Sequence, residues 1–252
     1  DFASYLREDL KLGQGDTVAI MSPNCIGFCV TSLGISMAGC IGTNVNPLYT
    51  PSELEHQLQD SKAKAIVIID LFGDKLDQVI ANTSVKHVVT LSIVDFFPTL
   101  KKMLLGFVLK RIRKVIPDMA SKHTKLGDAL AMGRKYASSR DLSAYTAGIT
   151  GKSVALYQYT SGTTGRSKGA ELNHLAVGGH CVLAPSPRPP SNLKAAFEKY
   201  QITWFTGINT LFAGLMAEPW FDRKLFANIR FCGSGGAAQQ TGSAIASMAI
   251  YI

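Results

Sequence analysis

Short apolar runs typical of β-strands alternate with helical patterns along most of this 252-residue chain, and this alternation limits the possible folds more than any other feature. The expected strands are Val18–Met21, Ala65–Ile69, His87–Leu91, Val154–Gln158, Thr203–Phe205 and Ile229–Cys232. The expected helices are Pro51–Ser61, Asp74–Asn82, Thr99–Val115, Asn192–Tyr200, Thr210–Ala217 and Ala237–Ala249. Strands separated by helices predict an α/β fold with mostly parallel sheets covered by helices.

The signals for element boundaries differ along the chain. Thr50 is placed to cap a helix whose first residue is Pro51 and whose third is Glu53, so this helix start is well defined. Residues 121–150 are polar, with scattered Ser, Gly and Ala. They predict a connection between two sheet units.

The segment Thr160–Gly169 follows a β-prone run and is rich in Gly, Ser and Thr. Its three glycines let backbone N–H groups turn toward an anion, its five hydroxyls donate hydrogen bonds, and Arg166 and Lys168 add positive charge. An ordinary surface turn is the alternative, but it needs none of these basic residues. A Walker P-loop is excluded, because Gly169 follows Lys168 where that motif needs Ser or Thr. The segment predicts a cradle for the phosphates of a nucleoside triphosphate.

Three segments carry a family resemblance. Tyr159–Gly169 resembles the AMP-binding signature of the acyl-adenylate-forming superfamily, Asn44–Leu58 is similar to bacterial long-chain fatty acid CoA ligases, and Phe205–Phe212 agrees with both. The resemblance implies that residues 1–252 are a partial AMP-binding domain, the incomplete N-terminal domain of the adenylate-forming enzyme fold. Against the family the chain is too short near 175–193, which implies either a true internal deletion or a misassembled sequence there, and the family's small C-terminal domain is expected to be absent.

The resemblance implies roles for particular residues. The phosphates of ATP would be bound by Thr160, Ser161, Gly162, Thr163, Thr164, Gly165 and Lys168, with Lys168 as the catalytic cation. Gly235, Gly236 and Ala237 would line the adenine pocket, and Gly207, Ile208, Asn209 and Thr210 the acyl pocket. ATP, CoA and Mg²⁺ are the implied cosubstrates and cofactor, although the family's usual Mg²⁺ ligands have no counterpart in this sequence.

The implied reaction joins a long-chain fatty acid to AMP with release of pyrophosphate, and CoA then displaces AMP. This truncated chain is expected to be inactive or weakly active, because the family's Tyr-Gly-x-Thr-Glu segment and adenylation lysine are missing. Two alternatives stay open: a ligase for another carboxylate, such as an aryl acid, and a non-catalytic nucleotide-binding derivative.

Cysteine usage bears on the cellular compartment. The five cysteines form no Cys-x-x-Cys pair and their number is odd, which disfavours a disulfide framework or a zinc site: Cys25, Cys29, Cys40, Cys181 and Cys232. The sequence contains no uninterrupted block of about 18 apolar residues, the length that a transmembrane helix needs. A cytoplasmic protein is expected.

Residues 96–117 contain six basic residues, no acidic residue and many apolar ones. This pattern predicts a basic amphipathic helix, which suits peripheral contact with an anionic membrane at the inner membrane face. Two alternatives compete with it: the apolar stripe faces the domain core, as in most amphipathic helices of soluble domains, or the lysines are merely a solvated face. Nucleic-acid binding is disfavoured, because no aromatic platform accompanies the basic residues.

Overall fold

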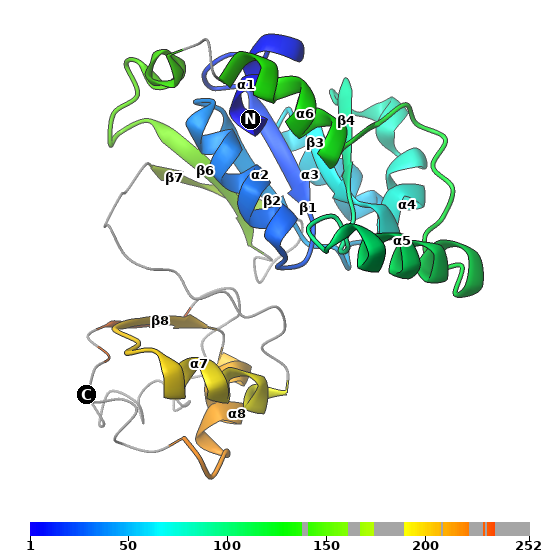
Figure 1. Ribbon diagram of the computed structural model, residues 1–252. Coiled ribbons are helices and arrows are strands. Elements are labelled where there is room, and N and C mark those ends of the chain that lie inside the picture. Colours follow the sequence, from blue (N-terminus) through cyan, green and yellow to red (C-terminus); the bar gives the residue numbers. More distant parts are fainter. Residues whose placement is uncertain are drawn as a thin grey trace. The chain divides into compact units, whose positions relative to one another are not determined.

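The computed structural model describes residues 1–137, 141–160, 167–173, 189–207, 209–221, 229 and 231–234 (Figure 1). Two compact units divide the chain. The first consists of Asp1–Tyr159 and Gly169–Val177, and the second of Thr160–Lys168 and Gly178–Ile252. The chain therefore leaves the first unit after Tyr159 and returns to it at Gly169.

The first unit is built on a seven-stranded sheet in the order β5-β4-β3-β1-β2-β6-β7. Its strands are β1 (Thr17–Met21), β2 (Ile41–Val45), β3 (Ala65–Ile69), β4 (His87–Leu91), β5 (Thr124–Lys125), β6 (Val154–Thr160) and β7 (Lys168–Asn173). Within the group of strands from β1 to β6, every pair of neighbouring strands is parallel. The mostly parallel α/β sheet predicted from the sequence is confirmed.

Helices cover both faces of this sheet (Figure 1). Val18 and Ile20 of β1 belong to a core that also contains residues of α1 (Phe2–Ser4), α2 (Ile26–Met37) and α6 (Leu126–Ala137). Ala19 and Met21 belong to the opposite core, with residues of α3 (Pro51–Asp60) and α4 (Gly73–Asp77). Alternate side chains thus enter opposite cores, which explains why β1 is buried throughout and shows no polar alternation.

Several expected elements differ from the structure at their ends. The expected helix Asp74–Asn82 is α4 followed by a 3₁₀ turn, Ile80–Asn82. The expected helix Thr99–Val115 is α5 (Thr99–Phe107), which continues as a π-helical turn, Val108–Ile112. Further short turns are Tyr5–Asp9 (π) and Asp70–Phe72 (3₁₀).

Residues 121–150 contain more structure than the polar connection expected from the sequence. They contribute β5, α6 and a 3₁₀ turn, Leu142–Thr146. Leu126, Ala129 and Tyr145 from this segment are buried in the first core. The segment therefore contributes both to the sheet and to its helical cover.

The second unit has a parallel pair of strands, β8 (Trp204–Gly207) and β9 (Phe231–Ser234). Its helices are a 3₁₀ turn (Pro190–Leu193), α7 (Lys194–Lys199) and α8 (Asn209–Met216). Phe197, Phe205 and Phe212 pack edge to face in its core, with ring centroids 5.3 and 5.5 Å apart. The expected helix Ala237–Ala249 lies outside the described residues.

Candidate functional site

Strand β6 leads directly into the Gly-rich segment. It lies parallel to β2, with Gly42 opposite Leu156 and Thr43 opposite Tyr157, and it ends at Thr160. Thr160 is therefore at the carboxyl edge of the sheet, where open α/β sheets bind ligands. Lys168 opens β7, a strand that the sequence did not predict. Ser161, Gly162, Thr163, Thr164 and Gly165 lie outside the described residues.

The two ends of the Gly-rich segment meet at Tyr159. Its hydroxyl donates a hydrogen bond of 2.5 Å to Asp60 Oδ2, and the side chain is only 8% exposed. Burial, followed by the bond to Asp60, raises the pKa of the Tyr159 phenol, so it stays protonated as a donor. A Cβ atom at Gly169 would lie 3.0 Å from Tyr159 Cζ, so the ring lies against the glycine backbone.

A second set of hydrogen bonds ties α3 to the strands beside it. Gln57 is fully buried, and its Nε2 donates to Thr43 Oγ1 at 2.9 Å and to the Asn44 carbonyl at 3.0 Å. Thr43 Oγ1 in turn donates to the Tyr157 carbonyl at 3.0 Å. The chain of bonds runs from α3 through β2 to β6.

In the second unit, two predicted pockets border the same strand pair. Gly207 ends β8, Ser234 ends β9, and the two residues are partners in the parallel register. Asn209 and Thr210 open α8 just after Gly207. Because parallel strands end at the same edge, Gly207 and Ser234 lie side by side there. Ile208, Gly235, Gly236 and Ala237 lie outside the described residues.

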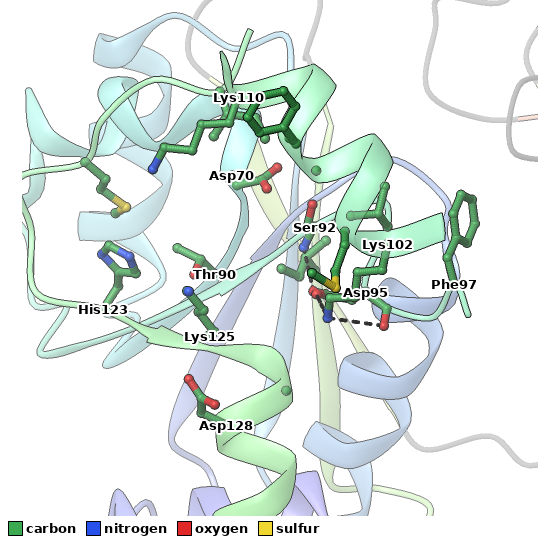
Figure 2. Close-up of a pocket in the computed structure, with 18 of the residues that line it drawn as sticks. Asp70, Thr90, Ser92, Asp95, Phe97, Lys102, Lys110, His123, Lys125 and Asp128 are labelled. Carbon is green, nitrogen blue, oxygen red and sulfur yellow. Dashed lines mark hydrogen bonds and ion pairs between the residues drawn. The ribbon is translucent and has the colours of Figure 1, made fainter. Parts of the chain in front are cut away.

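A cavity of about 900 Å³ lies outside the carboxyl ends of β3 and β4, with α5 along one side (Figure 2). Asp95 and Lys102 form an ion pair of 2.9 Å at its wall. Burial raises the pKa of Asp70, whose Oδ1 has no hydrogen-bond partner among the described residues. No predicted site residue lines this cavity. The position of Asp70 and Ser92, each just after an apolar strand, was the sequence signal that could have found it.

The described part of the chain offers neither a metal site nor a membrane-spanning helix. It contains no group of three or more His, Cys, Asp or Glu residues able to hold a metal ion. None of its helices has the length and apolar character needed to cross a membrane.

The chain is similar in sequence to a known enzyme family and to several curated proteins. The family described as AMP-binding enzyme matches residues 1–177. The long-chain-fatty-acid–CoA ligase of Salmonella typhimurium is 32% identical over 283 residues, which cover 95% of this chain and 50% of that protein. The chain thus spans about half the length of the curated relatives it matches.

Solved structures share the fold. The anthranilate CoA ligase AuaEII in complex with anthranoyl-AMP has a TM-score of 0.65 at 18% identity, over 94% of this chain and 48% of that one. ATP-bound MatB from Rhodopseudomonas palustris has a TM-score of 0.59 at 21% identity, with the same coverage of both chains.

Proposed function

Since the chain belongs to the AMP-binding enzyme family, we propose that it is part of an acyl-CoA ligase whose acid substrate is a long-chain fatty acid. The fatty carboxylate would attack the α-phosphorus of ATP to form acyl-AMP and pyrophosphate, and the CoA thiol would then displace AMP. The observation that carries the proposal is the 32% identity to a long-chain fatty acid ligase over 95% of this chain.

The Gly-rich segment would hold the β- and γ-phosphates through Thr160, Ser161, Gly162, Thr163, Thr164, Gly165 and Lys168. Its place after β6, at the carboxyl edge of the sheet, supports this role. Lys168 would be the catalytic cation, because its charge opposes the charge that develops on the departing pyrophosphate. No protein nucleophile is needed.

The shared edge of β8 and β9 supports the two pockets of the second unit. Gly207, Ile208, Asn209 and Thr210 would border the acyl chain, with Gly207 leaving room for it. Gly235, Gly236 and Ala237 would border the adenine ring. Both groups of the adenylate would then contact segments that follow neighbouring strands.

In the proposed reaction, Mg²⁺ would accompany ATP and CoA would be the second cosubstrate. The described residues contain no cluster that fits a metal ion, so we derive no step through Mg²⁺.

Two measurements on the purified chain test the function. ATP titrated by calorimetry should bind, and Lys168→Met should weaken binding by about tenfold or more through loss of a charge-assisted contact. ATP–pyrophosphate exchange, which we expect to be weak in this chain, should respond to palmitate. Exchange with anthranilate but not palmitate would instead favour an aryl acid ligase. ATP binding without exchange would favour a non-catalytic derivative, and failure to bind ATP would contradict both readings.

We also propose that the sequence near 175–193 has lost a segment that its relatives contain. The match to the Salmonella typhimurium ligase extends over 283 positions, more than the 252 residues of this chain, so some aligned positions have no counterpart here. Sequencing the coding region again tests this. A longer reading frame at 175–193 would contradict a true deletion.

The helix formed by α5 and Val108–Ile112 supports the proposed peripheral contact with an anionic membrane on the cytoplasmic side. Neither element buries a single residue. Large apolar side chains are exposed along it: Leu100, Met103, Leu104, Phe107 and Ile112. The apolar stripe therefore does not face the core, and the six basic residues of 96–117 complement anionic headgroups.

Vesicle sedimentation tests this contact. The chain should bind vesicles of phosphatidylcholine with phosphatidylglycerol far better than phosphatidylcholine alone. Leu100→Ser with Leu104→Ser should abolish binding, whereas the control, Ile26→Ser with Leu33→Ser on exposed positions of α2, should not. Equal binding to both vesicle types, or none, would contradict the proposal.

A further inference from the structure

The segment Asn44–Leu58 resembles fatty acid ligases, yet none of its residues has a role in the reaction proposed above. It contains most of α3, which ends at Asp60. This helix is attached to the strand that enters the Gly-rich segment at two places, through Gln57 and Thr43 to Tyr157, and through Asp60 to Tyr159.

The Asp60 attachment lies where the chain leaves the first unit. Tyr159 is the last residue before that exit and Gly169 is the residue of return. The Tyr159 ring lies against Gly169, while its hydroxyl is bonded to Asp60. Tyr159, the residue just before segment 160–168, therefore contacts both Gly169, the residue just after it, and Asp60 at the end of α3.

We propose that Asp60 and Tyr159 are positioning residues whose hydrogen bond, with the Tyr159 ring against Gly169, holds together the two ends of the phosphate-binding segment 160–168. The inference rests on the proposed function only in that this segment binds ATP. Holding the ends in place before ATP arrives reduces the conformational entropy that binding must overcome. It also gives a reason for glycine at 169, because any side chain would meet the ring.

A matched hydrogen bond elsewhere in the first unit provides the control. Tyr145 is also buried, and its hydroxyl donates to Glu8 Oε1 at 2.9 Å. Tyr145→Phe and Tyr159→Phe therefore each remove one phenol–carboxylate bond and keep the ring. Of the two tyrosines, Tyr159 alone precedes the Gly-rich segment and contacts Gly169, so a merely structural role predicts similar behaviour of both variants.

Hydrogen exchange of the ATP-free chain tests the positioning role without using ATP. Tyr159→Phe should speed exchange in peptides covering β6 and β7 by about tenfold, the factor expected for one bond to a charged acceptor. The rest of the first unit should stay unchanged. Tyr145→Phe should leave β6 and β7 as in the wild type. Unchanged exchange in Tyr159→Phe, or an equal increase over the whole unit, would overturn the inference.

ATP titration then tests what the positioning does. Asp60→Ala and Tyr159→Phe should each weaken ATP binding by about tenfold. Asp60→Asn should restore most of the affinity, because its amide oxygen still accepts the phenol proton. Wild-type affinity in Asp60→Ala would overturn the inference. A wild-type chain that binds no ATP would contradict the proposed function, while the exchange experiment would still decide whether the ends are held.

Discussion

Helices α3 and α5 both carry apolar residues at helical spacing, and both follow parallel strands of the same sheet, yet they are attached to it very differently. Helix α3 buries Leu54, Gln57 and Leu58 in the core beside β1 and β3. Helix α5 buries no residue, and Leu100 and Leu104 are 83% and 62% exposed. The comparison teaches that a helical apolar pattern predicts a helix, whereas the neighbouring elements decide what covers its apolar face.

The start of α3 is also more firmly fixed than the start of α5. Thr50 and Glu53 form a capping box at the start of α3, which satisfies backbone N–H groups that a helix leaves unpaired. Pro98 precedes α5 and provides no side-chain cap. Helix α5 is joined to the preceding loop by the Lys102–Asp95 ion pair. It borders a cavity, whereas α3 borders a packed core.

The largest expected effect comes from truncating the buried face of α3. Leu58→Ala should lower the free energy of unfolding by about 2–5 kcal/mol, because it leaves a cavity in the core. The matched variant Leu104→Ala on α5 should change it by less than about 0.5 kcal/mol. Urea titration followed by circular dichroism measures both. Similar losses in the two variants would show that the exposed face of α5 is covered in solution.

The capping box gives a smaller effect that depends on pH. Thr50→Ala should cost about 1 kcal/mol at pH 7. Hydrogen bonds from the Thr50 backbone and hydroxyl hold the pKa of Glu53 below its ordinary value of 4.5. A lowered carboxyl pKa stabilises the fold above that ordinary value, and the gain disappears as the pH falls through the lower folded-state pKa.

The cost of Thr50→Ala should therefore shrink between pH 7 and pH 3, as measured by urea titration at both values. Ser at position 50 keeps a hydroxyl, so Thr50→Ser should retain most of the stability. A cost that grows on acidification would contradict the role given to Glu53.

The sequence predicted the elements whose local signals agree with their surroundings. Ala65–Ile69 and His87–Leu91 are strands with the predicted ends, since continuous apolar runs suit a sheet buried on both faces. The helix Leu126–Ala137 was missed because its Gly and Ala residues suggest part of a polar connection, although Leu126 and Ala129 are buried in the core. Strand β2 (Ile41–Val45) was missed because Gly42 and Asn44 are weak strand formers.

For the candidate site, the local sequence predicted where the Gly-rich segment lies, but not the long-range contacts that hold it in place. The place of Thr160 after a strand followed from the β-prone run before it. The bond between Asp60 and Tyr159 joins residues 99 positions apart, and no local pattern indicates it. The pairing of Gly207 with Ser234 likewise depends on how two strands align.

The smallest expected effect concerns the ion pair that fastens α5. Lys102 and Asp95 have side chains 43% and 16% exposed, so solvent screens their attraction only in part. Lys102→Gln should lower the free energy of unfolding by about 0.5 kcal/mol at low salt and by less at 1 M NaCl, where the Debye length is about 3 Å. Lys101→Gln, one residue away on the same helix and not in an ion pair among the described residues, is the control and should have no such salt dependence. If the two variants responded to salt alike, the ion pair would contribute nothing, and the difference between α5 and α3 would be larger still.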